Sequence, residues 1–252
     1  MAIVINGSGT VTGLSVGGLP DGTVDAGTLA TNSVDSAELI DGAVDDSHMA
    51  SISGRKNLII NGAMNVAQRG TSSTSEGYAT VDRFFTYIES CEQLAVTQTQ
   101  STDNPNGFGS SYKLDVTTAE TATEANDQYE LVTRLEGQDL QQLQHNSSGA
   151  KSVTLSFWVR STKTGTYILE IYHSDTQSRN QSHSYTISQA DTWEYKSITF
   201  SGDTSATIDN DNAATFYVQW GLFAGTDYNG STLQTTWVNL GDQTKRFAGQ
   251  VN

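Results

Sequence analysis

Short runs in which apolar and polar residues alternate follow one another from Asn57 to the end of the chain, and this pattern predicts β-strands. Glycine, asparagine, aspartate, serine and threonine separate the runs, as is typical of turns. One segment, Glu136–Gln144, has the apolar spacing of a short helix. The predicted strands are Asn57–Ile60, Val81–Ile88, Leu94–Thr99, Tyr112–Val116, Tyr129–Leu135, Ser152–Arg160, Gly165–Tyr172, Ser184–Ser188, Trp193–Phe200, Ala214–Leu222 and Thr235–Leu240. The order favours an antiparallel sandwich over alternating β-α-β units.

The segment Ser152–Arg160 has the clearest alternation in the chain. Because side chains of a strand alternate between two faces, one face is predicted to lie in the core and the other to face outward. The core face comprises Val153, Leu155, Phe157 and Val159, and the outward face comprises Ser152, Thr154, Ser156, Trp158 and Arg160. A tryptophan among hydroxyls and an arginine suits stacking against a sugar ring. The alternative is that Trp158 packs beneath a loop or against another subunit.

The segment Ala214–Leu222 offers further candidates for sugar binding. Alternation places Trp220 in the core together with Phe216 and Val218, and leaves Tyr217 and Gln219 outward. The candidate carbohydrate-binding residues are therefore Trp158, Arg160, Tyr172, Tyr217 and Gln219, although the sequence does not show whether their strands are neighbours. Trp193, which opens another predicted strand, is expected to be a core residue.

Before this region the pattern is a repeat of ten residues, DGTVDAGTLA, TNSVDSAELI and DGAVDDSHMA, over residues 21–50. Each unit has too few large apolar side chains to bury them against its own chain, so the repeat favours several chains wrapped together. The predicted core of such a trimeric shaft is Val24, Leu29, Val34, Leu39, Val44 and Met49. A flexible linker is the alternative, but linkers do not keep a register of this kind. The repeated aspartates are interpreted as solvated acid and not as a metal site.

Composition also divides the chain into an early and a late part, because every Tyr, Phe and Trp lies at or after Tyr78. The formal net charge of −15 argues against nucleic acid as a partner, since nucleic-acid binding depends on Lys and Arg at phosphates. It also argues against anionic membrane surfaces, and no apolar run is long enough to span a bilayer. The first residues lack the basic and apolar regions of a secretory signal, so assembly in a cytoplasm is expected.

Motifs for catalysis or for a cofactor are not found in the sequence. The four histidines do not have the spacing of a metal-binding pair, and His173 with Asp175 near His183 is explained as a loop at a strand end. The single Cys91 excludes an intramolecular disulfide, and its acidic neighbours Glu89 and Glu92 should raise the pKa of its thiol. We therefore expect no enzyme, no cofactor and no metal.

Several segments together resemble tail-fibre-like proteins of tailed bacteriophages, particularly marine ones. The opening MAIVINGSGTVTGLSVGGLPDGTVD with its Val-Asp decapeptides resembles the stem of these proteins. The segments Asn57–Met64, Gln68–Gly70, Asp82–Phe84, Ser156–Ser161 and Trp193–Asp203 resemble their carbohydrate-binding-module-like jelly roll. The resemblance implies an all-β protein, with an intertwined trimeric shaft over residues 1–54 and a jelly-roll sandwich over 55–252. Such proteins usually continue further, so the sandwich is expected to be truncated at its C-terminal end.

The function expected from this resemblance is attachment of a virion to host surface glycans by a homotrimeric fibre. Its N-terminus would bind other tail or capsid proteins, and the protein would be located on the virion. One alternative is a purely structural virion component, such as a capsid fibre, baseplate spike or adaptor, in which the jelly roll is an inert spacer. A third hypothesis, a spike that cleaves polysaccharide, needs a carboxylate pair in a groove.

Overall fold

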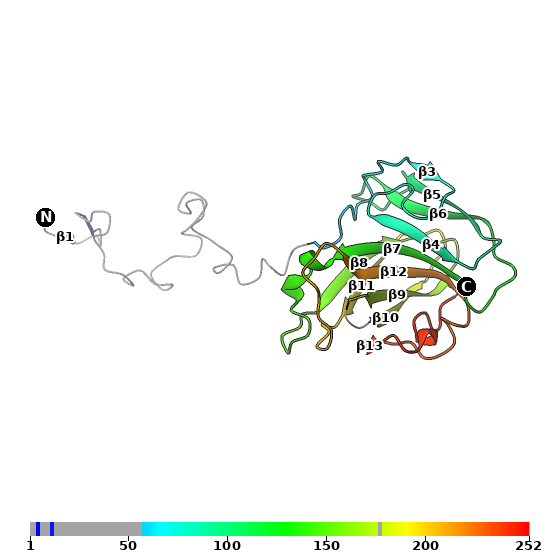
Figure 1. Cartoon of the computed structure of the whole chain (residues 1–252). Coiled ribbons are helices and arrows are strands. Elements are labelled where there is room, and N and C mark those ends of the chain that lie inside the picture. The colour runs from blue at the N-terminus through cyan, green and yellow to red at the C-terminus, as the bar shows by residue number, and fades with distance from the viewer. Residues whose placement is uncertain (1–3, 6–10, 13–56, 176–177, 252) are drawn as a thin grey trace. The chain divides into compact units, whose positions relative to one another are not determined.

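The computed structural model describes residues 4–5, 11–12, 57–175 and 178–251. The chain divides into two units, Met1–Arg55 and Lys56–Asn252, and the labelled strands β3 to β13 of Figure 1 belong to the second. In the first unit, β1 (Val4–Ile5) pairs antiparallel with β2 (Val11–Thr12). The predicted shaft residues Val24, Leu29, Val34, Leu39, Val44 and Met49 lie outside the described residues. The trimeric shaft therefore stays a prediction.

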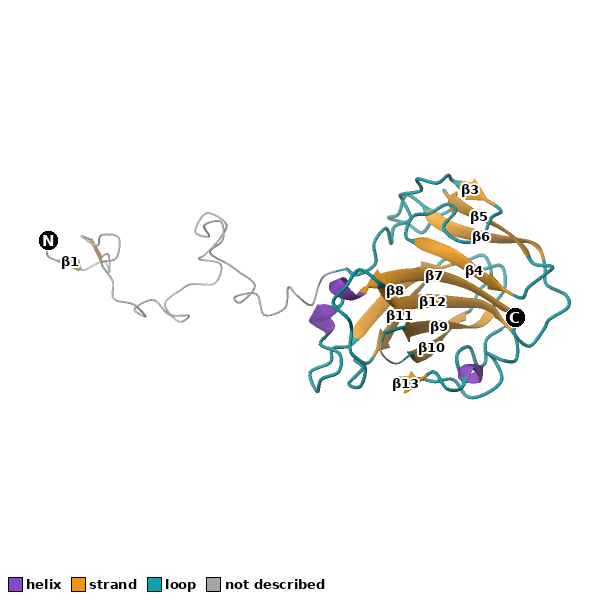
Figure 2. Ribbon diagram, viewed as in Figure 1, coloured by secondary structure: helices purple, strands orange, loops and turns teal. Residues whose placement is uncertain are grey.

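The second unit is an antiparallel β-sandwich (Figure 2). Its largest sheet has six strands in the order β13-β10-β9-β12-β7-β4. These strands are β13 (Val238–Asn239), β10 (Arg179–Ile187), β9 (Gly165–His173), β12 (Ala214–Ala224), β7 (Gln128–Glu136) and β4 (Phe84–Glu89). Strands from distant parts of the chain are neighbours in this sheet, since β12 lies between β9 and β7.

Two smaller sheets complete the sandwich. One pairs β11 (Glu194–Phe200) with β8 (Val153–Val159), and the other has the order β3-β5-β6, from β3 (Ser72–Ser73), β5 (Ala95–Ser101) and β6 (Ser111–Thr118). The chain leaves the six-stranded sheet after β7 for β8, returns for β9 and β10, leaves again for β11 and returns for β12. Such repeated crossing between layers is typical of a jelly roll.

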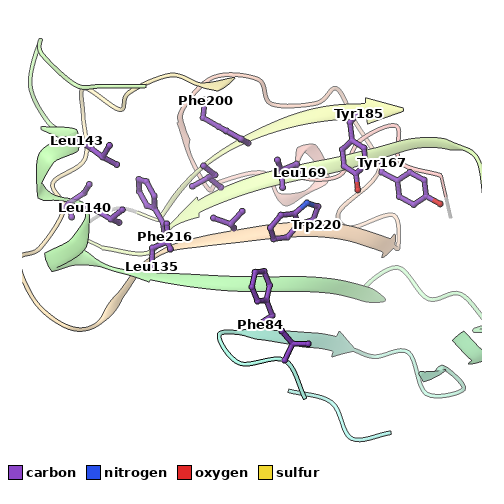
Figure 3. Close-up of a cluster of buried hydrophobic side chains, with 14 of the residues drawn as sticks. Phe84, Leu135, Leu140, Leu143, Tyr167, Leu169, Tyr185, Phe200, Phe216 and Trp220 are labelled. Atoms are coloured by element: carbon purple, nitrogen blue, oxygen red, sulfur yellow. The ribbon is translucent and has the colours of Figure 1, made fainter. Parts of the chain in front are cut away.

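The core lies between the six-stranded sheet and these smaller sheets, and Figure 3 shows side chains of its main cluster. The large sheet contributes Phe84, Leu169, Phe216, Val218 and Trp220, as alternation predicts for the last three. The opposing strand β8 packs Val153, Leu155, Phe157 and Val159 against the same cluster, and this confirms the core face predicted for it. From β6, Tyr112 packs edge-on against Phe84, with 6.4 Å between ring centroids.

Differences from the predicted elements have local causes. The segment Asn57–Ile60 is not a strand but leads into a turn, where Asn61 has a φ of 59° and its side chain donates to the carbonyls of Val66 and Asp82. The predicted helix is two 3₁₀ turns, Gly137–Asp139 and Gln141–Leu143, which still bury Leu140 and Leu143. Gly137 lies so close to the segment around Asp209 that a Cβ there would overlap the Asp209 carbonyl oxygen.

The C-terminal segment after β12 covers part of the outer face of the six-stranded sheet. It forms a second apolar cluster in which Tyr228 and Phe247 pack on Ile168 of β9. Gly221 of β12 permits this approach, since a Cβ there would lie 2.6 Å from Phe247 Cδ1.

Candidate functional site

A hollow of about 300 Å³ lies on the outer face of the six-stranded sheet, beside the C-terminal segment. This volume is at the lower end of the range for small-ligand sites, roughly 300–1,000 Å³. Four tyrosines line it, so we call it the tyrosine hollow: Tyr87 from β4, Tyr172 from β9, Tyr217 from β12, and Tyr228 from the C-terminal segment. Its other lining residues are Phe85, Glu89, Gln128, Val132, Arg134, Gln219, Leu240, Gln243 and Arg246.

Strand register places aromatic side chains side by side along one wall of the tyrosine hollow. Tyr217 of β12 is directly opposite Tyr172 of β9, and the two rings meet with centroids 5.6 Å apart. On its other side, Tyr217 is opposite Arg134 of β7, whose guanidinium carbon lies 4.7 Å from the ring centroid. The same guanidinium lies 4.5 Å from the ring centroid of Phe85 on β4. The wall therefore combines apolar ring surface with hydrogen-bond donors.

Beneath the hollow, a buried ion network fixes the positions of the floor side chains. Arg246 donates to both carboxylate oxygens of Glu170, with Nε···Oε1 and Nη2···Oε1 distances of 2.9 and 2.7 Å. Glu170 also accepts from Asn180 and Ser182 at 2.8 and 3.1 Å. A second carboxylate, Glu130, lies 3.6 Å from Arg246 Nη2. The charges of the floor are thus paired inside the protein.

Two glutamines complete this network. Gln128 and Gln219 both donate to the Glu130 carboxylate, and the Gln219 carbonyl accepts from Arg246 at 3.3 Å. Burial raises the pKa of Glu130 to about 7, although Arg246 opposes the shift. The pKa of Arg246 is raised despite its burial, because Glu170 and Glu130 stabilise its charge. Arg246, Glu130 and Glu170 therefore act as one unit that supports the sheet surface.

The structure brings together only part of the predicted set. Tyr172, Tyr217 and Gln219 line the tyrosine hollow, whereas Trp158 and Arg160 belong to β8 and its end, in the opposing layer. The five residues thus do not form one surface. Gln219 is only 7% exposed, and both ends of its amide are engaged in the buried network. Its position suits support of the floor better than direct contact with a ligand.

Trp158 is exposed, at 41%, and its ring lies 5.6 Å from that of Tyr195 on β11. The strand pair continues this face with hydroxyl contacts: Thr154 to Thr199 at 2.8 Å and Ser156 to Ser197 at 3.0 Å. The outward orientation predicted for Trp158 is confirmed. We call this surface, comprising Thr154, Ser156, Trp158, Tyr195, Ser197 and Thr199, the hydroxyl face.

Near the end of β8, the guanidinium of Arg160 is paired with carboxylates and is not free to bind a ligand. It makes ion pairs with Asp103 and Asp191. Trp193 lies just before β11, half-buried, and its indole N–H donates to Asp103 at 3.2 Å. The prediction that Trp193 is a core residue is wrong, because its side chain is only half-buried and does not belong to the apolar cluster.

Several lining residues were not predicted: Phe85, Tyr87, Arg134, Tyr228 and Arg246. Alternation in Tyr129–Leu135 does place Arg134 on the outward face, so this signal could have found it. In Val81–Ile88 both faces carry apolar residues, so alternation does not show that Phe85 and Tyr87 face outward. Tyr228 and Arg246 lie in irregular segments, where no alternation of apolar and polar residues indicates which way a side chain points.

Among the described residues, no group of three or more His, Cys, Asp and Glu side chains is placed to hold a metal ion. His173 lies beside His145, with ring centroids 6.1 Å apart, while His183 packs elsewhere, against Phe200. Burial lowers the pKa of His145 to about 4 and also lowers that of His173. Burial, with Asp127 adding to it, raises the pKa of the Cys91 thiol to about 11. The expected direction is confirmed, but the main cause is burial and not the sequence neighbours Glu89 and Glu92. No helix in the described part of the chain is long and apolar enough to cross a membrane.

Comparison with known proteins gives structural likenesses only. No known protein family and no curated protein matches the sequence. Among solved structures, the enzymatically active domain of bacteriophage CBA120 tailspike protein 4 is similar over 67% of this chain, at 15% identity and a TM-score of 0.36. The chain spans only 20% of the length of that protein.

A family 11 carbohydrate-binding module from Clostridium thermocellum, in complex with a β-1,3-1,4-mixed-linked tetrasaccharide, is similar over 60% of this chain and 86% of its own. Its identity is 14% and its TM-score 0.34. The module of the cellulosomal cellulase Lic26A-Cel5E from the same organism gives 14% and 0.34, over 59% of this chain and 84% of its own. Scores this low do not establish a shared function.

Proposed function

We propose that the sandwich is a glycan-binding module of a bacteriophage fibre, and that the tyrosine hollow is its binding site. The observation that carries the proposal is the wall of Tyr172 and Tyr217 above a floor fixed by buried ion pairs. Sugars present C–H groups that pack on aromatic rings and hydroxyls that bond to polar neighbours. A wall whose side chains are already positioned loses little conformational entropy when a ligand binds.

Binding without catalysis fits the two carboxylates of the buried network beneath the hollow. Glu170 is occupied by Arg246, Asn180 and Ser182, and both oxygens of Glu130 accept from glutamine amides. A glycosidase needs one carboxyl group free to protonate the leaving oxygen and a second free to act as base or nucleophile. These two carboxylates instead hold the floor together.

The wider role we propose is attachment of the virion to host surface glycans, with homotrimeric fibres that combine weak sites. Linked sites raise avidity without any new contact. The sequence repeat over residues 21–50 supports the trimer, and the resemblance of the sequence to tail-fibre proteins supports the virion location. Light scattering should give about three times the chain mass of 27.1 kDa; a single-chain mass would refute the trimer.

The test of the site is a glycan array on the purified protein, followed by calorimetry of any glycan that binds. Tyr217→Ala should weaken binding at least tenfold, since it removes the central ring of the wall. Tyr195→Ala is the matched control, because it removes an exposed tyrosine from the hydroxyl face. Equal affinities for the two variants would place the site elsewhere, and an array without any signal would refute glycan binding.

A structural role is the second candidate, and the hydroxyl face favours it. Trp158 and Tyr195 form an exposed aromatic pair there, which a neighbouring protein of the particle could cover. This alternative predicts that Trp158→Ala lowers incorporation into particles and leaves adsorption per particle unchanged. The glycan-binding proposal predicts normal incorporation for Tyr217→Ala and reduced adsorption.

A further inference from the structure

Arg134 differs from the other arginines that the structure describes. Each of the others has a carboxylate partner: Arg69 with Asp82, Arg83 with Glu136, Arg160 with Asp103 and Asp191, Arg179 with Asp203, and Arg246 with Glu130 and Glu170. Within the described part of the chain, no ion pair or hydrogen bond joins the guanidinium of Arg134, which lies between two aromatic rings. The side chain is exposed at the wall of the tyrosine hollow.

The two rings hold the guanidinium without using its donors. Phe85 and Tyr217 belong to β4 and β12, the strands on either side of β7, so they contact Arg134 from opposite sides. A guanidinium donates hydrogen bonds in its own plane and attracts rings at its flat faces, so stacking leaves the N–H groups available. The same contacts restrict the rotamers of a long side chain before any ligand arrives, and this lowers the entropy lost on binding.

A planar cation held in this way suits an anionic group on the ligand. Arginine binds carboxylate and phosphate through two parallel N–H bonds, and such charge-assisted bonds are stronger than neutral ones. The floor acids Glu130 and Glu170 make their ion pairs with Arg246 and not with Arg134. Glu89, also at the hollow, accepts from the Tyr87 hydroxyl at 2.7 Å.

The net charge of the whole protein disfavours binding of a ligand with many negative charges. A net charge of −15 repels a densely charged polyanion at long range. One acidic group among neutral sugars faces less repulsion, and at the hollow it would meet an arginine with no acid partner. Neutral sugars on either side of it would then pack on the tyrosines.

We infer that the tyrosine hollow selects an acidic glycan, in which a carboxylate or phosphate carried by one sugar binds the Arg134 guanidinium. This inference rests on the proposed glycan-binding function and specifies the ligand class for that site. It also assigns Phe85 a positioning role, since the ring holds the guanidinium from the β4 side.

The test compares matched ligands by calorimetry. The probes are an oligosaccharide containing a uronic acid, its carboxyl-reduced neutral counterpart, and an oligosaccharide carrying a sugar phosphate. The wild-type protein should bind at least one acidic probe at least tenfold more tightly than the neutral one. Arg134→Gln should abolish that difference by weakening binding of the acidic probe more than binding of the neutral one. Arg134→Lys keeps the charge and should keep only part of the preference.

Three controls separate the effects of net charge, of folding and of the binding site. Lys163→Gln makes the same change in net charge at an exposed loop position and should leave the preference intact. Thermal unfolding of both Arg134 variants shows whether loss of the stacked side chain has disturbed the sheet. A third variant, Tyr217→Ala, should weaken binding of acidic and neutral probes alike.

The outcomes distinguish this inference from the function on which it rests. If the wild type binds neutral glycans at the hollow and prefers neither acidic probe, the acidic selectivity is refuted and glycan binding stands. If Arg134→Gln retains the preference, the anion is recognised elsewhere and the inference fails. If no glycan binds at all, the proposed function fails first. Between the two acidic probes, the tighter one identifies carboxylate or phosphate as the recognised group.

Discussion

The two layers of the sandwich present outward faces of opposite character, although both come from alternating strands. Beneath the tyrosine hollow, the outer surface of the six-stranded sheet has buried charges, with Arg246 bonded to Glu170 and close to Glu130. The hydroxyl face carries paired Ser and Thr side chains and the exposed rings of Trp158 and Tyr195. The difference arises from what covers each face, because the C-terminal segment folds over the first and supplies its arginine.

Burial decides how much an ion pair matters in the two layers. Arg246→Ala would leave Glu130 and Glu170 buried without their cation, and such a change costs about 3–5 kcal/mol. The matched change in the other layer, Arg160→Ala, breaks pairs with the well-exposed Asp103 and Asp191, where exposed pairs contribute at most about 1 kcal/mol. Urea denaturation of both variants would measure the difference.

Loss of Arg246 should also alter the hollow, since Gln219 and Gln128 are positioned by the same network. Glycan affinity should therefore fall in Arg246→Ala and not in Arg160→Ala. If the two variants lose equal stability, the network does not stabilise the sheet as its burial implies.

The sequence predicts those differences between the two outward faces that arise within a single strand. It does not predict those that depend on contacts between distant segments. Period two along one strand correctly separates Phe157 from Trp158 and Trp220 from Tyr217, because each strand packs one face on the core. The same rule places Gln219 outward and cannot foresee its burial, since Arg246 reaches it from an irregular segment after β13. The sequence likewise cannot show whether Trp158 and Tyr172 lie on the same surface, because strand order in a sandwich depends on pairing between distant segments.

The contributions of the two layers to the stability of the protein should depend on pH in opposite directions. Glu130 has its pKa raised to about 7 by burial, so the folded state holds its proton more tightly than the unfolded state, whose pKa is about 4.3. The contribution of Glu130 to stability is therefore full below about pH 4 and is lost as the pH rises through 7. At the start of β11, the pKa of Glu194 is lowered by the hydrogen bond from Lys196 and by the N–H of Gln189, so its contribution is present above its unfolded pKa and is lost as the pH falls.

Glu130→Gln should remove the first of these dependences and Glu194→Gln the second. We expect the stability difference between wild type and Glu130→Gln to change by about 1–3 kcal/mol between pH 5 and pH 8, in favour of the variant at high pH. The corresponding difference for Glu194→Gln should be much smaller and of opposite sign. Thermal unfolding between pH 5 and pH 8 checks the first dependence, and extending it below the unfolded pKa of glutamate, about 4.3, checks the second. A flat difference for Glu130→Gln would show that Arg246 keeps it ionised throughout.

The smallest expected effect is on the hydroxyl face, where Trp158→Ala removes an exposed ring that contacts Tyr195. Aromatic pairs add about 0.5–1.5 kcal/mol beyond buried area, and this exposed pair should lie at the lower end. Glycan affinity should change less than twofold, because Trp158 lies in the layer opposite the tyrosine hollow. A tenfold loss of affinity on Trp158→Ala, with Tyr217→Ala unchanged, would instead make the hydroxyl face the sugar platform and would reverse the roles of the two faces.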